Sequence, residues 1–323
     1  MYVGRAMLFV PGDRPDRIVK ALGTAADAVA VDFEDAVADA HKEIARSRTA
    51  EVLAGLSRRP GPAVYVRINA LGHPGAGADL DAVSRMLGDA RLDGLILPKA
   101  ESAAQVEEVD RALTAAESAA GSGTGRLPLV PIVETARGVL DAAAVASAAP
   151  RVRALVFGTL DLARELGVEP TVEGHELLHA RSQVVLASRA AGLTGPLDGP
   201  YQALDDEEGL VRSSVAARRL GFTGRVVLHP RQVGPVRDAF APAPYELDHA
   251  REVLAAYEAA QDRGAGALRL ADGTFVDRPV VARAVALLSA AESDRGGSGV
   301  AAGDGGSPGS PASHGSSGAE VTR

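Results

Sequence analysis

The amino-acid sequence predicts a (β/α)8 barrel, also called a TIM barrel, with a C-terminal extension, and three observations lead to this prediction. Short apolar runs of strand length alternate with segments of helical spacing along residues 1–230. The chain has 323 residues, of which 46% are hydrophobic, enough for one large α/β barrel or two smaller domains. Neither nucleotide-binding glycine fingerprint is present, so a doubly wound open sheet is the weaker alternative.

Eight short runs rich in Val, Ile, Leu and Ala are predicted as the strands of the barrel. Pro11-Gly12 ends the first run, and the seventh run is the weakest. The predicted strands are Ala6–Val10, Ala28–Phe33, Val64–Ile68, Gly94–Leu97, Leu129–Val133, Ala154–Phe157, Gly195–Leu197 and Arg225–Leu228.

Segments with helical patterns connect these strands. Pro15 stands in the first turn of the first helix, a position where its missing N–H costs nothing. The predicted helices are Pro15–Leu22, Ala36–Leu56, Asp79–Leu87, Ser102–Ala119, Arg137–Ala148, Glu173–Ala191 and Glu207–Leu220.

The pattern changes after residue 230. Two helices, a hairpin with an Asp-Gly turn and a last helix are predicted at Arg231–Phe240, Tyr245–Arg263, Leu268–Val276 and Pro279–Ala291. Residues 293–323 are rich in Gly, Ser and Pro and lack apolar periodicity, so we expect a disordered tail. The predicted domains are therefore a barrel at 1–230, an extension at 231–292 and the tail.

Composition and charge narrow the class of protein. The net charge of −8 disfavours nucleic acid as a partner, because phosphate binding requires a basic face. The absence of Cys excludes disulfides, a thiolate metal site and a Cys nucleophile. The N-terminus becomes polar too early for a signal peptide, and no apolar run reaches membrane-spanning length. These features predict a cytoplasmic protein without a membrane partner.

Two carboxylates follow neighbouring predicted strands. Glu134 ends the fifth strand, Asp161 follows the sixth, and an Ala-rich helix connects the strands. A parallel crossover brings both strand ends to one rim of the barrel, where the carboxylates would repel each other without a cation. Oxygen ligands of this kind favour Mg²⁺, with Mn²⁺ as an alternative. Each residue also fits an ordinary acid at a helix N-terminus.

Arg67, at the end of the third strand, is suited to bind a carboxylate ligand with its planar guanidinium. The alternative is a structural ion pair with Glu34 or Asp35, which follow the second strand. The other strand ends carry further polar residues, among them Arg14, Asp32, Asn69, Lys99, Asp198 and His229. The rim therefore has the composition of a metal site facing an anionic ligand.

Ten motifs fall in order along the chain up to about Leu288. They are LFVPGDRPDRIVKAL (8–22), AVDFEDAV (30–37), VRIN (66–69), GLILPKAES (94–102), PIVETARG (131–138), FGTLDLARELG (157–167), GPLDGPY (195–201), DEEGL (206–210), GFTGRVVLHPRQV (221–233) and DGTFVDRPV (272–280). With these motifs the chain resembles the citrate lyase β-subunit-like branch of the HpcH/HpaI aldolase superfamily, which includes malyl-CoA and citramalyl-CoA lyases.

The resemblance implies a Mg²⁺-dependent lyase that cleaves a carbon–carbon bond in a 3-hydroxy-dicarboxylyl-CoA thioester, giving an acyl-CoA and an α-keto acid. It implies that Glu134 and Asp161 bind the metal and that Arg67 binds the keto acid, with Gly158 also at the substrate. Glu34 and Asp35 would act behind the metal ligands through metal-bound water.

The resemblance also assigns residues that contact CoA and residues that act between subunits. Phe9, Arg14 and Lys20 match CoA-contacting positions, although exposed helix residues are the plainer interpretation of Arg14 and Lys20. Asp277 matches an acid/base supplied by the C-terminal lid of a neighbouring subunit, with a helix-cap role as its alternative. This arrangement implies a homo-oligomer, a trimer or hexamer.

Other functions fit the same residues. They are a malyl-CoA-type thioesterase on the same site, a class II aldolase acting on free hydroxy-keto acids, a lyase that uses a carrier-protein thioester in place of CoA, and a non-enzymatic anion-binding subunit.

Overall fold

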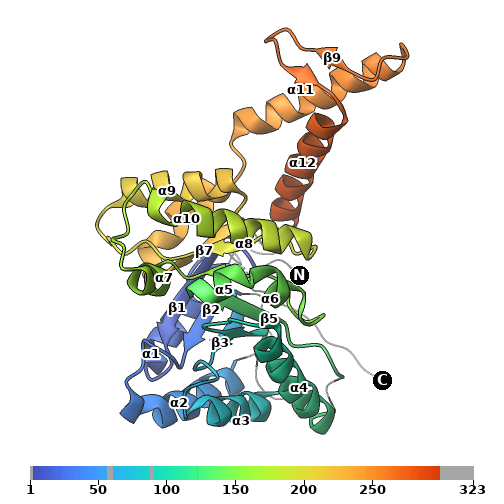
Figure 1. The fold of residues 1–323 in the computed structure, drawn as a ribbon. Helices are drawn as coiled ribbons and strands as arrows, with labels where there is room; N and C mark the ends of the chain where they lie inside the picture. The colour runs from blue at the N-terminus through green and yellow to red at the C-terminus, as the bar shows by residue number, and fades with distance from the viewer. Residues whose placement is uncertain (1–2, 57–60, 88–90, 122, 299–323) are drawn as a thin grey trace, which may run out of the picture. The chain divides into compact units, whose positions relative to one another are not determined.

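The computed structural model describes residues 3–56, 61–87, 91–121 and 123–298, and it confirms the barrel (Figure 1). Eight parallel strands pair in chain order, and the first strand pairs with the eighth, which closes the barrel. The strands are β1 (Ala6–Pro11), β2 (Ala28–Asp32), β3 (Ala63–Arg67), β4 (Gly94–Leu97), β5 (Leu129–Val133), β6 (Val156–Phe157), β7 (Leu197–Asp198) and β8 (Gly224–Val227).

Helices surround these strands in Figure 1. They are α1 (Pro15–Leu22), α2 (Lys42–Ala54), α3 (Ala76–Met86), α4 (Ala103–Ala119), α5 (Ala136–Leu140), α6 (Ala142–Ser147), α7 (Thr159–Leu166), α8 (Leu178–Ala190), α9 (Glu207–Leu220) and α10 (Val233–Phe240), with short 3-10 turns η1 (Asp39–His41), η2 (His175–Leu177) and η3 (Pro230–Gln232).

Four connections differ from the prediction, and the helix predicted at Glu173–Ala191 is one of them, divided into η2 and α8. The helix predicted at Ala36–Leu56 is divided into η1 and α2, and the helix predicted at Arg137–Ala148 is divided at Asp141 into α5 and α6. Helix α7 was not predicted; it begins at Thr159, and a single residue separates it from the end of β6. Gly167 ends α7 with a φ of 68°, a left-handed conformation that glycine adopts without strain.

Alternate residues of each strand face the interior of the barrel, since side chains of a strand have a period of two. One buried cluster contains these inward residues, including Met7, Ala30, Tyr65, Ile132 and Val226. The alternate strand residues pack with the helices in a second cluster. The same alternation places the next inward residue of several strands at the C-terminal mouth: Phe9, Asp32, Arg67 and Glu134.

The chain divides into two compact units, and the division falls between Ala241 and Pro242. Helix α10 packs against α9, β1 and β8 and therefore lies in the first unit, although the predicted boundary at residue 230 precedes it. The use of the C-terminal part as a separate lid and oligomerisation domain stays a prediction.

The second unit contains α11 (Pro244–Gln261), the antiparallel pair β9 (Leu268–Arg269) and β10 (Phe275–Val276), and α12 (Arg278–Ser298). Its own core includes Val253, Tyr257 and Val276. The backbone of α12 includes residues 293–298, where the tail was predicted to begin, and the remaining tail lies outside the described residues. No helix among the described residues has both the length and the apolarity that a membrane crossing requires.

Candidate active site

Four strand ends bring a cluster of five charged side chains together at the C-terminal mouth of the barrel. Asp32 belongs to β2, Arg67 to β3, Lys99 follows β4 and Glu134 follows β5, while Glu34 lies two residues beyond β2. C-terminal strand ends are where (β/α)8 barrels place their chemistry. We refer to these five residues as the mouth cluster.

Arg67 is held by two carboxylates of the mouth cluster. Its Nε and Nη2 donate to the two oxygens of Asp32 at 2.7 and 2.6 Å, and its Nη1 lies 2.7 Å from Glu34 Oε2. The guanidinium also lies 5.2 Å from the centre of the Phe9 ring. Arg67 thus has the structural ion pair expected as the alternative, chiefly with Asp32. A guanidinium has five N–H donors, so two remain for a ligand.

The end of β2 is fixed from several sides, which positions Glu34. Asp32 accepts hydrogen bonds from the backbone N–H groups of Glu34 and Ala36 at 2.9 and 3.0 Å. Buried Lys42 donates to the carbonyl oxygens of Phe33 and Glu34 at 2.9 and 3.0 Å. Glu34 is buried, and this burial raises its pKa against the opposing effects of Arg67 and Lys99. The loop after β2 therefore fixes the position of the buried Glu34 carboxylate.

Glu134 is the most strongly perturbed carboxylate of the site. Burial, followed by the nearby Glu34 charge, raises the pKa of Glu134 to about 8, although Arg67 opposes this shift. Its Oε1 accepts a hydrogen bond from the backbone N–H of Lys99 at 2.9 Å. The charged form of Glu134 therefore lacks a sufficient positive partner in the described structure.

Gly158 lies directly against Glu134. The N–H of Gly158 donates to the Val133 carbonyl at 3.0 Å, which continues the pairing of β5 with β6. A Cβ added at Gly158 would lie 2.3 Å from the Cβ of Glu134 and 2.4 Å from its Oε2. Only glycine leaves room for the Glu134 carboxylate at this place.

Asp161 lies in the first turn of α7 and acts electrostatically on Glu134. The Asp161 charge contributes to the raised pKa of Glu134, as expected for carboxylates at adjacent strand ends. Its Oδ1 accepts a hydrogen bond from exposed Arg164 at 3.1 Å. The predicted proximity of Glu134 and Asp161 is consistent with this coupling, whereas a shared metal stays a prediction.

The donor set fits a hard divalent cation. Carboxylates outnumber the cations that face them: Asp32, Glu34, Asp35 and Glu134 lie around Arg67 and Lys99, and Asp161 faces Glu134 and exposed Arg164. Within the described ranges, no group of three or more His, Asp or Glu side chains is arranged to hold a metal. A cation here would take two carboxylates and leave its other positions to water and substrate, which is the usual mode of Mg²⁺.

The remaining predicted site residues are not part of the mouth cluster. Arg14 is exposed and pairs with Asp16 at 3.2 Å, and Lys20 is exposed on α1, as in their plainer interpretation. Asp35 is exposed, with Oδ2 3.6 Å from Lys99 Nζ. Asp277 belongs to the second unit and accepts a hydrogen bond from the N–H of Val280 at 3.4 Å, which is the expected cap of α12. Their roles toward CoA and catalysis stay predictions.

Asp32 and Lys99 were noted at strand ends but not chosen as site residues. The signal that would have selected Asp32 is the alternation of β2, which places Ala28, Ala30 and Asp32 on the inward face. Lys99 follows Pro98 and has a left-handed backbone φ of 49°, which neither spacing nor composition predicts.

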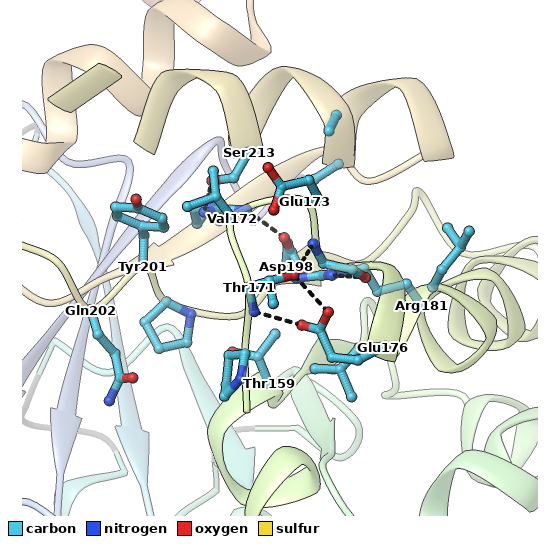
Figure 2. A pocket seen from close by; sticks show the side chains of 18 of the residues that line it. Thr159, Thr171, Val172, Glu173, Glu176, Arg181, Asp198, Tyr201, Gln202 and Ser213 are labelled. Carbon is cyan, nitrogen blue, oxygen red and sulfur yellow. Dashed lines mark hydrogen bonds and ion pairs between the residues drawn. The ribbon is translucent and has the colours of Figure 1, made fainter. Parts of the chain in front are cut away.

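A separate pocket of about 290 Å³ lies beside the strand ends of β7 and β8 (Figure 2). Its wall includes Asp198, which accepts hydrogen bonds from Arg181 Nε at 3.2 Å and from Arg225 Nη2 at 2.5 Å. None of the mouth cluster lines this pocket. It is therefore distinct from the predicted site.

The fold and the mouth cluster define a (β/α)8-barrel enzyme with a carboxylate-rich site at its C-terminal face. The family model described as HpcH/HpaI aldolase/citrate lyase matches residues 5–230, and the chain belongs to this family. The resemblance stated from the motifs is thereby confirmed.

Several relatives are similar over nearly the whole chain. Citrate lyase subunit beta of Leuconostoc mesenteroides is 34% identical, covering 90% of this chain and 94% of that protein. The L-malyl-CoA/beta-methylmalyl-CoA lyase of Cereibacter sphaeroides is 34% identical (89% and 94%), and the (3S)-malyl-CoA thioesterase of that organism is 35% identical (90% and 95%).

A solved structure is also similar. CitE from Mycobacterium tuberculosis, in complex with magnesium, acetoacetate and coenzyme A, is 36% identical, with a TM-score of 0.73 and coverage of 90% of this chain and 98% of that one. The chain is an enzyme of this lyase family.

Proposed function

We propose that this protein is a Mg²⁺-dependent carbon–carbon lyase that cleaves a 3-hydroxy-dicarboxylyl-CoA thioester, such as malyl-, methylmalyl- or citramalyl-CoA. The observation that carries this proposal is buried Glu134, whose charge the neighbouring Arg67 and Lys99 offset only in part, beside an Arg67 with two uncommitted N–H donors. Lyase relatives that act on malyl-CoA and a neighbouring structure that holds magnesium and coenzyme A support it.

Glu134 and Asp161 are the residues that would hold the cation. When bound, Mg²⁺ would supply Lewis-acid stabilisation of negative charge on substrate oxygens. Mn²⁺ offers the same oxygen-seeking chemistry and is the alternative cation. The Gly158 position leaves the Glu134 carboxylate unobstructed, so its orientation is set before the cation arrives.

The other residues bind the substrate and handle the protons. The free N–H donors of Arg67 bind the carboxylate of the departing α-keto acid, and the rigid pair with Asp32 fixes their direction. In cleavage, the carboxylate of Glu34 or Asp35 accepts the proton of the substrate hydroxyl through a bridging water, the carbon–carbon bond breaks, and its electrons move onto the thioester as an enolate. Asp277 of a neighbouring subunit then protonates the enolate carbon, which yields the acyl-CoA.

CoA binding is assigned to β1 and α1. Phe9 contacts the Arg67 guanidinium with its ring and so borders the mouth cluster. Exposed Arg14 and Lys20 are available to meet the phosphates of CoA. The action of Asp277 at a neighbouring subunit's site requires an oligomer, and we propose a cytoplasmic homotrimer or hexamer.

Product analysis tests the proposed reaction. The protein is incubated with malyl-, methylmalyl- and citramalyl-CoA, once with Mg²⁺ and once with EDTA, and the products are separated by chromatography. An acyl-CoA with an α-keto acid, formed only with Mg²⁺, is expected, and Glu134→Gln and Asp161→Asn should abolish it. Cleavage unaffected by EDTA would contradict the proposal.

A thioesterase is the second candidate, since the malyl-CoA thioesterase relative is as similar as the lyase relatives. The same assay separates the two reactions, because hydrolysis releases free CoA and the intact hydroxy-diacid. Formation of these products alone would replace the lyase proposal with the thioesterase.

A further inference from the structure

Lys99 has a backbone conformation that is unusual for a lysine. Its φ is 49°, in the left-handed region that glycine favours, and no other non-glycine residue in the described part of the chain has a positive φ. A side chain is unfavourable there, because its Cβ comes too close to the following carbonyl oxygen. Such strain at an active-site rim is retained where the surrounding contacts fix the residue.

Lys99 contacts the carboxylates of two strand ends at once. Its backbone N–H donates to Glu134 Oε1 at 2.9 Å. Its ammonium contacts Glu34 Oε1 directly and lies 3.6 Å from Asp35 Oδ2. The left-handed backbone lets the N–H and the side chain serve different carboxylates.

Glu34 is therefore held between two cations. Lys99 contacts one of its oxygens, and Arg67 Nη1 lies 2.7 Å from the other. Lys99 also links Glu34 to Glu134, because its ammonium contacts Glu34 and its backbone N–H donates to Glu134 Oε1 at 2.9 Å. A Glu34 released from Lys99 would be a competing ligand for any cation that Glu134 holds.

We propose that Lys99 is a positioning residue that keeps Glu34 off the cation bound by Glu134 and Asp161, and so reserves a coordination position for the substrate. The inference rests on the proposed function. Mg²⁺ requires near-octahedral oxygen coordination, so a third carboxylate strengthens its binding but displaces a water or a substrate oxygen.

The test removes the ammonium with Lys99→Met and measures Mg²⁺ binding by calorimetry without substrate. Loss of a nearby positive charge and gain of a ligand should tighten binding by roughly tenfold. At the same time kcat for thioester cleavage should fall, because Glu34 occupies the substrate position. Purely structural damage would weaken binding and turnover together.

Two further variants separate the causes. Lys99→Gly keeps the N–H, relieves the backbone strain and should show the same tighter Mg²⁺ binding with an unchanged or higher Tm. In Lys99→Met combined with Glu34→Gln, the gain in affinity should disappear, since the added ligand is gone. Arg48→Met, which removes an exposed charge paired with Glu51, is the control and should change neither measurement.

The outcomes test the role of Lys99 separately from the proposed function. If the wild-type protein binds no Mg²⁺, both the proposed function and the role of Lys99 are overturned. If the wild-type protein binds Mg²⁺ and both Lys99 variants bind it equally or more weakly, the role of Lys99 is overturned and the proposed function stands.

Discussion

At the scale of single residues, the arrangement of charged side chains decides what the site can bind. Glu134 and Asp161 were predicted at one rim because a crossover helix joins their strands, and their electrostatic coupling agrees with that expectation. As the alternative to ligand binding, Glu34 or Asp35 was expected to pair with Arg67, but the two hydrogen bonds of Arg67 go to Asp32. The sequence places all three acids at the end of the second strand, but it does not show which of them lies closest to Arg67. The strain at Lys99 likewise depends on backbone geometry that no residue pattern encodes.

Glu134 makes the stability of the cation-free protein depend on pH. Its pKa of about 8 lies above the usual 4.5, so between these values the folded state binds more protons than the unfolded state. Stability is therefore lost as the pH rises through this window, by up to about 1.4 kcal/mol per pH unit. Glu134→Gln should abolish this component of the decline.

Urea unfolding in EDTA at pH 5.5, 7 and 8.5 measures this effect. The variant should gain stability relative to the wild-type protein as the pH rises. A constant difference between the two proteins at all three pH values would contradict the burial argument.

Gly158 should tolerate no side chain. In Gly158→Ala the new Cβ would lie 2.3 Å from Glu134 Cβ, so the carboxylate must turn away. We expect turnover to fall by roughly 100-fold or more, the cost of a displacement near 1 Å in a catalytic group. Gly77→Ala is the matched control, because nothing lies within 4 Å of a Cβ added there. Equal activity of the two variants would show that turnover does not depend on the position of the Glu134 carboxylate.

At the scale of elements, the apolar patterns predicted which strands and helices exist better than they predicted the lengths of those elements. β4, β5, α1 and α9 have the predicted bounds, since each has a clear apolar run or a clear start signal. β6 and β7 are only two residues long, shorter than the runs predicted for them. α7, which follows β6 after a single residue, was not predicted.

Short β7 depends on a buried ion pair for its attachment. Arg225 of β8 donates to Asp198 at 2.5 Å and to Ser213 of α9 at 2.8 Å, so it joins two strands and a helix. Arg225→Met would leave Asp198 with Arg181 alone, and we expect a loss of roughly 3–5 kcal/mol in the free energy of unfolding.

Chemical denaturation followed by circular dichroism checks this value. Exposed Arg212, which pairs with Glu208 within α9, provides the control variant Arg212→Met, expected to change stability by less than about 1 kcal/mol. Equal effects of the two variants would mean that the buried pair does not hold β7.

At the scale of the whole molecule, the barrel was predictable and the use of the second unit was not. Eight alternating strand and helix signals define a barrel without knowledge of any contact. The hairpin and the long helices of the second unit were also predicted, whereas α10 packs with the barrel rather than with the extension. The sequence composition shows where the strand–helix pattern ends. Whether the next helix packs with the barrel or with the extension depends on its contacts, which the composition does not show.

The proposed trans action of Asp277 predicts complementation between subunits. Glu134→Gln and Asp277→Ala should each be inactive in the cleavage assay, since one lacks a metal ligand and the other the proton donor. Refolding an equal mixture should restore a fraction of activity, because some sites then combine an intact Glu134 with an intact Asp277. Light scattering should show one oligomer in all samples, and no recovery in mixed oligomers would contradict trans action.

The most direct test of the account is anomalous diffraction from crystals grown with Mn²⁺ and pyruvate. We predict a manganese peak within about 2.3 Å of carboxylate oxygens of both Glu134 and Asp161, with the pyruvate carboxylate against Arg67. A well-ordered site without such a peak, or a peak bound elsewhere on the barrel, would contradict it.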